Sequence, residues 1–170
     1  MNKELMDRTF SYSKVYVICG LLSVLVLLIM VISFVKEGDN LLALLFFLCF
    51  CLFLWGSYRT ALKIIINDDG IRQAFYNHDR VSIDWNKING IFVKKLPNYF
   101  DLKSRYYNSY LVEGIKNNQI KKIRFHEKIN GAKELLDLIN KYAKINNIKL
   151  VAVDKDVETP LNQITLYDND

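Results

Sequence analysis

The sequence contains few of the residues from which catalytic and metal centres are built. It has only two histidines and three cysteines, and Cys19, Cys49 and Cys51 all lie in apolar stretches. No CxxC pair or Cys/His ligand spacing occurs, so neither a disulfide framework nor a zinc site is expected. The GxGxxG, HExxH and GxSxG motifs are also missing. His78 and His126 each adjoin a carboxylate, but no nucleophile motif accompanies them. We therefore expect no cofactor, no metal and no enzymatic activity.

Charged residues are missing from two long apolar stretches near the N-terminus. Residues 15–35 carry no charge, and as a helix rising about 1.5 Å per residue they would span roughly 31 Å, close to the ~30 Å core of a bilayer. Residues 41–58 form a shorter second stretch that is apolar on every face, unlike a helix buried in a soluble protein. A signal peptide is the alternative for the first stretch, but its apolar core would be shorter and would end in a cleavage site. The pattern predicts a transmembrane hairpin over residues 15–58, with its turn at 36–40.

The predicted spans also lack ionisable residues, which transporters and proton relays place at membrane depth. The hairpin is therefore interpreted as an anchor. Basic residues are retained on the cytoplasmic side of a membrane. They flank the hairpin more than they occupy its turn, which holds only Lys36, so both termini, including residues 1–14, are predicted to be cytoplasmic. The flanking basic residues are Lys3, Arg8, Lys14, Arg59 and Lys63.

Residues 59–153 have the pattern of a β-rich domain. The turn signal at 67–70 separates two strand-like runs, and further alternating runs follow as far as residue 126. The apolar period then changes to that of one amphipathic helix, predicted over 131–146, and residues 148–153 read as one more short strand. Residues 154–170 are acidic and contain Pro160, which predicts a flexible tail.

Three segments of this domain resemble a known family. They are the DDG turn, the VSIDWNKING segment and the helix in IRFHEKINGAKELLDLINKY. Together they resemble bacterial pleckstrin-homology-like (PH-like) domains. More narrowly, the chain is similar over about residues 15–150 to YcxB-like membrane proteins, which place such a domain after two transmembrane helices.

The resemblance implies a partly open, seven-stranded barrel closed by a C-terminal helix, and it implies no single activity. The predicted fold is thus an α+β membrane protein. A two-helix transmembrane hairpin precedes a PH-like antiparallel β-barrel or bent sheet, which is capped by one amphipathic helix. The expected location is the bacterial inner membrane.

The chain carries a net charge of +5, with its basic excess before residue 150. The best-known PH domains bind phosphoinositides near their first strand-connecting loop, but here that loop, at 67–70, contains two carboxylates. Basic and aromatic residues gather elsewhere and form the candidate lipid or partner surface. The alternatives are a solvated outer face for the basic residues and packing within the sheet for the tyrosines. The candidate residues are Lys94, Lys95, Tyr99, Lys103, Arg105, Tyr106, Lys121, Lys122 and Arg124.

Three functions remain open on the sequence. The first is a membrane-anchored scaffold or regulator whose cytoplasmic domain binds a protein partner or its own copies, since confinement raises local concentration. The second is an immunity protein that neutralises a toxin at the membrane. The third is peripheral binding of anionic lipid headgroups through the basic face. No nucleic-acid-binding motif occurs, so a nucleic-acid partner is not expected.

Overall fold

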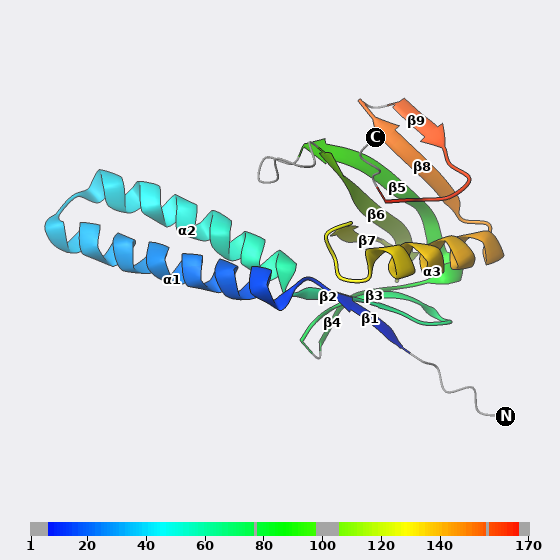
Figure 1. Cartoon of the computed structure of the whole chain (residues 1–170), viewed down its shortest axis with the longest axis horizontal. Helices are drawn as coiled ribbons and strands as arrows, with labels where there is room; N and C mark the ends of the chain where they lie inside the picture. Colours follow the sequence, from blue (N-terminus) through cyan, green and yellow to red (C-terminus); the bar gives the residue numbers. More distant parts are fainter. Residues whose placement is uncertain (1–6, 77, 98–105, 156, 167–170) are drawn as a thin grey trace. The chain divides into compact units, whose positions relative to one another are not determined.

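The computed structural model describes residues 7–76, 78–97, 106–155 and 157–166. The chain divides into two compact units: one is Ser11–Leu62, and the other is Met1–Phe10 together with Lys63–Asp170. The first unit contains two long helices, and the second contains two sheets and a third helix (Figure 1). This α+β organisation, with two apolar helices ahead of the sheets, confirms the coarse fold prediction.

The helical unit is a hairpin of α1 (Lys14–Glu37) and α2 (Asn40–Thr60). The side chain of Ser13 caps α1 by accepting a hydrogen bond from the Val15 N–H at 3.3 Å. Gly38 ends α1 in the left-handed conformation, with φ of 79°, which glycine adopts without a steric penalty. Asp39 then caps α2 by accepting from the Leu42 N–H at 3.2 Å. The connection between the helices, at residues 38–39, lies within the predicted turn of 36–40.

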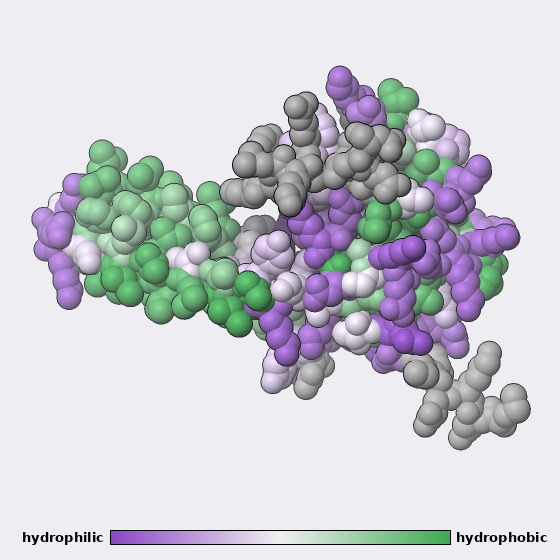
Figure 2. Space-filling view, viewed as in Figure 1, coloured by the Kyte–Doolittle hydropathy of each residue, from purple (hydrophilic) through white to green (hydrophobic). Residues whose placement is uncertain are grey.

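The two helices pack through small residues at one position and aromatic rings at another. A Cβ atom added to Gly20 would lie 2.6 Å from Ser57 Oγ, so the backbones approach closely there. Phe34 and Phe46 stack with their ring centroids 5.2 Å apart. Among the described residues of α1 and α2, only Ala43 and Ser57 are buried. The remaining apolar side chains give the helices the almost continuous hydrophobic surface seen in Figure 2.

The second unit is built from two sheets. The first has the strand order β1-β2-β3-β4, and the second has the order β7-β6-β5-β8-β9. Tight hairpins join β2 to β3, β3 to β4 and β6 to β7. The strands of the first sheet are β1 (Arg8–Ser11), β2 (Leu62–Ile66), β3 (Gly70–Phe75) and β4 (His78–Asp84). Those of the second are β5 (Ile88–Pro97), β6 (Tyr106–Lys116), β7 (Gln119–His126), β8 (Lys149–Asp154) and β9 (Val157–Pro160).

Helix α3 (Ala132–Ile145) is amphipathic, as its apolar period predicts, and buries Leu135, Leu136, Ile139 and Ala143. It follows β7 and precedes β8 in the chain, and it lies between the two sheets in Figure 1. Its Glu134 side chain lies 3.6 Å from Arg8 of β1. The inward side chains of both sheets, including those of Ile64, Ile91 and Ile123, are almost completely buried. The apolar core of this unit therefore lies between the sheets and beneath α3.

The sheets do not close into a barrel. No backbone ladder between described strands joins the two sheets. Side chains bridge them instead: Gln73 Nε2 donates to the Arg124 carbonyl at 3.1 Å, and Lys116 Nζ donates to Ser82 Oγ. The expected antiparallel arrangement is also incomplete, because β8 pairs with β5 in parallel. The crossover through α3 allows this, since it lets the chain re-enter the sheet in the same direction.

The structure corrects the prediction of a flexible tail over residues 154–170. Within that range, Val157–Pro160 form β9, which pairs with β8. Ile164 is only 2% exposed, and its backbone N–H and carbonyl both bind the side-chain amide of Asn140, at 2.9 and 2.8 Å. Acidic composition and Pro160 suggested disorder, but strand pairing, one buried apolar side chain and its hydrogen bonds hold the described residues of this range in place.

The N-terminal segment also contributes more to the fold than the sequence indicated. Residues 8–11 form β1, an edge strand of the four-stranded sheet, and the Phe10 side chain is buried. Asp7 accepts hydrogen bonds from Asn67 at 3.0 Å and from Arg72 at 2.8 Å. Residues 7–10 are thus an integral part of the β-rich unit.

Candidate functional site

The predicted surface residues divide between two faces of the five-stranded sheet. Residues directly opposite in neighbouring strands share a face, so the register decides the division. It places Lys94, Lys122 and Arg124 together on the face that turns away from the core. Lys95, Tyr106 and Lys121 occupy positions of the opposite parity. Tyr99, Lys103 and Arg105 lie outside the described residues.

The alternation along β7 determines which of its side chains reach this face. Ile123 and Phe125 are buried in the core, whereas Lys122 and Arg124 are exposed. Lys121 faces the other way, where its Nζ donates to Gln119 Oε1 at 2.8 Å. Successive side chains of a strand point to opposite faces, so the adjacent Lys121 and Lys122 lie on opposite faces of the sheet.

The face that turns away from the core also carries apolar side chains, which were not among the predicted surface residues. In the register, Phe92 of β5 is opposite Val151 of β8 on one side and Leu111 of β6 on the other, and Leu111 is opposite Arg124. The next row contains Val153, Lys94, Ser109 and His126. We call the outer patch the set Phe92, Lys94, Leu111, Arg124, Val151 and Val153.

The apolar residues of the outer patch are half-buried, while Lys94 and Arg124 are exposed. An antiparallel sheet with one wet face usually alternates between apolar residues inside and polar residues outside. Here both faces of the central strands are apolar. The signal was present in the sequence, because residues 91–93 and 150–153 are apolar without interruption. It could be interpreted only once the strand register was known.

Polar and aromatic groups lie beside the outer patch. Lys122 forms an ion pair with Glu113 at 3.3 Å, an exposed contact of small energetic value. The rings of Tyr107 and His126 meet edge to face with centroids 5.6 Å apart, and Lys128 Nζ lies 5.3 Å from the centre of the Tyr107 ring. Burial, with the nearby Lys128 charge, lowers the pKa of His126 to about 4. His126 is therefore neutral near pH 7, and the positive charge of the patch comes from Lys94 and Arg124.

The acidic turn between β2 and β3 serves the fold. Asn67 Oδ1 accepts hydrogen bonds from the backbone N–H groups of Asp69 and Gly70, at 3.1 and 3.0 Å. The Asn67 carbonyl accepts from Trp85 Nε1 at 2.9 Å, and Asp68 accepts from the Tyr142 hydroxyl at 2.5 Å. This hydrogen bond to Asp68 raises the pKa of Tyr142 to about 12. These interactions tie the turn to Trp85 and to α3.

The described residues contain no group of three or more His, Cys, Asp or Glu side chains arranged to hold a metal ion. His78 is exposed at the start of β4, whereas His126 packs against Tyr107 on the five-stranded sheet. The outer patch is therefore the arrangement that best combines the sequence-predicted residues. Its chemistry suits contact with another surface. The apolar side chains provide area that can be buried on binding, and the cations can orient an oppositely charged partner.

No protein-family model matches the chain, and no curated protein or solved structure is detectably similar to it.

Proposed function

We propose that the chain is a membrane-anchored, PH-like protein without enzymatic activity, and that its outer patch binds a protein partner. In this proposal α1 and α2 cross the bacterial inner membrane and both termini are cytoplasmic. The β-rich unit then acts as a scaffold or regulator at the cytoplasmic face. Anchoring confines the unit to the membrane surface, so a modest contact suffices for binding.

The helical unit supports the membrane part of the proposal. The helices are 24 and 21 residues long, and at about 1.5 Å per residue each reaches the ~30 Å thickness of a bilayer core. The 18-residue windows that best fit a span are only 6% and 11% buried. A core helix of a soluble protein would be mostly buried, so these helices require another apolar environment. A bilayer supplies it.

The strand order supports the PH-like part. Four strands (β1 to β4) form one sheet, three strands (β5 to β7) begin the next, and α3 follows. The resemblance described above implies seven strands followed by a helix. The parallel strand β8 and the edge strand β9 are additions to that pattern, and the two helices are inserted between β1 and β2.

The outer patch is the observation that carries the proposed interaction. Its apolar row of Val151, Phe92 and Leu111 crosses three neighbouring strands and ends at Arg124. Aromatic and arginine side chains are enriched at protein contact sites. With Lys94 and Arg124 as the charged members, the matching surface would be apolar with acidic residues at its rim. We therefore propose an acidic protein partner.

Site-specific crosslinking in intact membranes tests this function. A photoreactive amino acid replaces Leu111 in the outer patch, and the matched control replaces Lys144, an exposed residue of α3. We expect a reproducible protein adduct from position 111 that position 144 does not give. Arg124→Glu should abolish the adduct, whereas Lys133→Glu, a charge reversal on α3, should leave it unchanged. Recovery of lipid adducts alone would contradict the proposed protein partner.

A further inference from the structure

The end of β3 presents two aromatic side chains to solvent. Phe75 is 42% exposed and Tyr76 is 74% exposed. Tyr76 has a φ of 56°, in the left-handed region that residues other than glycine seldom occupy. The tight hairpin from β3 to β4 accounts for the positive φ, because two-residue hairpin turns require it. The exposed rings are the feature to explain, since they leave apolar surface in water.

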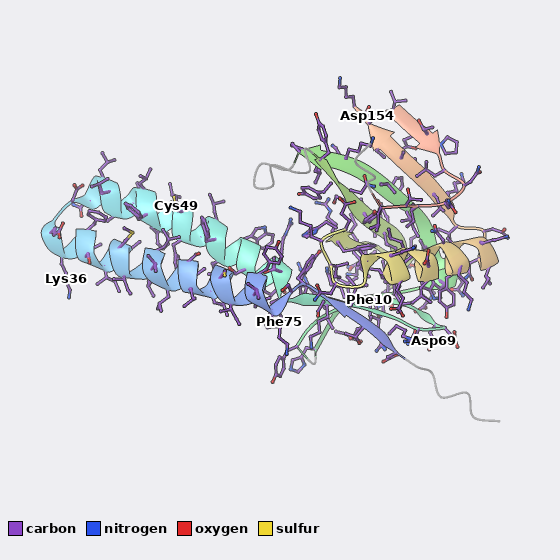
Figure 3. The ribbon with its side chains drawn as sticks, viewed as in Figure 1. Phe10, Lys36, Cys49, Asp69, Phe75 and Asp154 are labelled. Atoms are coloured by element: carbon purple, nitrogen blue, oxygen red, sulfur yellow. The ribbon has the colours of Figure 1, made fainter. Side chains whose placement is uncertain are left out.

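The topology of the four-stranded sheet determines where these rings lie. Asp7, just before β1, binds Asn67, just after β2, so β1 and β2 are antiparallel. The Asn67 N–H donates to the Gly70 carbonyl at 3.2 Å, which closes the tight hairpin between β2 and β3. The end of β1, the start of β2 and the end of β3 therefore share one end of the sheet. Figure 3 shows Phe75 and Asp69 at opposite ends of β3.

The chain joins the helices at that same end. Two residues separate β1 from α1, and one residue separates α2 from β2. An extended chain covers at most about 3.6 Å per residue, so these connections span only a few ångströms. If α1 and α2 cross the membrane, this end of the sheet is held close to its surface. The opposite end of the sheet, with Asp69, carries neither of these connections.

The chemistry of the β3 end suits a membrane interface. Tyrosine favours the headgroup level, where its ring lies among acyl chains and its hydroxyl among polar groups. Arg80 is exposed two residues into β4, and cations are attracted to anionic headgroups. Arg72 lies between two carboxylates, with Asp7 at 2.8 Å and Asp79 at 3.4 Å, so it offsets only part of their negative charge. The segment thus combines two exposed aromatic rings with one exposed cation, Arg80.

We infer that Phe75 and Tyr76 insert into the headgroup region of the membrane that holds α1 and α2. This inference rests on the proposed anchoring. The occupant is the bilayer itself, because the short connections bring these rings to its surface without the need for another protein. The contact provides a third point of attachment and limits the rotation of the β-rich unit, which fixes the direction in which the outer patch faces.

Fluorescent labelling of the full chain tests the inference. In a variant whose three cysteines are replaced by alanine, Tyr76→Cys carries an environment-sensitive NBD label, and Asp69→Cys is the matched control at the other end of β3. A third variant retains only Cys49, in the middle of α2. Each is reconstituted into vesicles of phosphatidylethanolamine and phosphatidylglycerol, with no other protein present. Near-ultraviolet circular dichroism confirms that each labelled variant retains its packed aromatic residues.

We expect the label at position 76 to be blue-shifted and quenched by lipids that carry a doxyl group near the headgroup. Aqueous iodide should quench it several-fold less than the label at position 69. If Cys49 is quenched by lipid but positions 76 and 69 are equally accessible to iodide, the inference fails while the anchoring stands. If Cys49 is itself accessible to iodide, the anchoring fails and the inference fails with it.

Discussion

The rings of Trp85 and Tyr142 stack with centroids 4.7 Å apart and planes within 12° of parallel. Trp85 belongs to the short 3₁₀ helix η1 (Trp85–Lys87) after β4, and Tyr142 belongs to α3. Both also bind the turn between β2 and β3, through Asn67 and Asp68. The stack therefore joins the three sequence segments on which the family resemblance rests. In this structure those segments form a folding cluster, and the candidate interaction surface lies elsewhere.

The first prediction concerns this cluster. Trp85→Ala removes a buried aromatic side chain and should lower the free energy of unfolding by about 3–5 kcal/mol. Tyr142→Phe retains the stacked ring and loses only the hydrogen bond to Asp68, so a loss of about 1 kcal/mol is expected. Urea unfolding of the detergent-solubilised chain, followed by circular dichroism, measures both. Equal losses in the two variants would contradict a dominant role for the stack.

Local sequence patterns predicted most elements of the β-rich unit but could not predict how distant segments pair. The turn signal at Asn67–Gly70 and the apolar period of α3 each depend on neighbouring residues, so they could be recognised in the sequence. Strand β1 was missed because its four residues are separated from β2 by the entire helical hairpin. The burial of Ile164 was missed because it depends on the side-chain amide of Asn140, which belongs to another element.

The candidate site shows the same difference: features that depend on neighbouring residues were predicted from the sequence, and features that depend on strand pairing were not. Alternation along β7 separates Lys122 and Arg124 from Ile123 and Phe125, and this required no knowledge of other strands. The apolar part of the outer patch required the register that brings Phe92 beside Val151 and Leu111. A parallel pairing across a helical crossover has no local sequence signal. The sequence therefore indicated the cations of the surface and not its apolar centre.

The second prediction concerns the C-terminal segment. Ile164→Ala should lower the free energy of unfolding by about 2–4 kcal/mol, since the side chain is buried. Asn140→Ala removes two hydrogen bonds and leaves the backbone groups of Ile164 without these partners, at a cost of about 1–3 kcal/mol. Gln163→Ala, at an exposed neighbouring position, is the control and should change stability little. Urea unfolding measures all three. A flexible tail would predict no effect from any of them.

The third prediction concerns the pH dependence of stability. Burial lowers the pKa of His126 to about 4, compared with 6.5 for an unperturbed histidine. Between these values the unfolded chain binds more protons than the folded chain, so stability falls as the pH falls from 6.5 to 4. The contribution of His126 should be on the order of 2–3 kcal/mol across this window. His126→Gln should remove that part of the pH dependence.

His78→Gln, which replaces the exposed histidine at the start of β4, is the matched control for this experiment. Denaturant unfolding at a series of pH values compares both variants with the original chain. Because carboxylates titrate over the same range, the informative quantity is the difference between each variant and the original chain at each pH. If the two variants give the same difference, the pH dependence does not arise from His126.

The fourth prediction concerns the packing of α1 against α2. A side chain at Gly20 would meet Ser57, whereas one at Gly56 would meet nothing within 4 Å. Small residues at such positions allow membrane helices to pack closely. Gly20→Leu should therefore separate the helices and lower the thermal stability of the hairpin, and Gly56→Ala should be neutral or slightly stabilising.

Rescue distinguishes this contact from a general effect of replacing glycine. In Gly20→Ala the added Cβ conflicts with Ser57 Oγ, so combining it with Ser57→Gly should restore part of the lost stability. The comparison of both single variants with the double variant isolates the interaction between the two positions. Fluorescence of Trp55 in α2 can follow thermal unfolding of the reconstituted chain. If the two substitutions act additively, Gly20 and Ser57 are not coupled, and the close approach of the helices does not stabilise the hairpin.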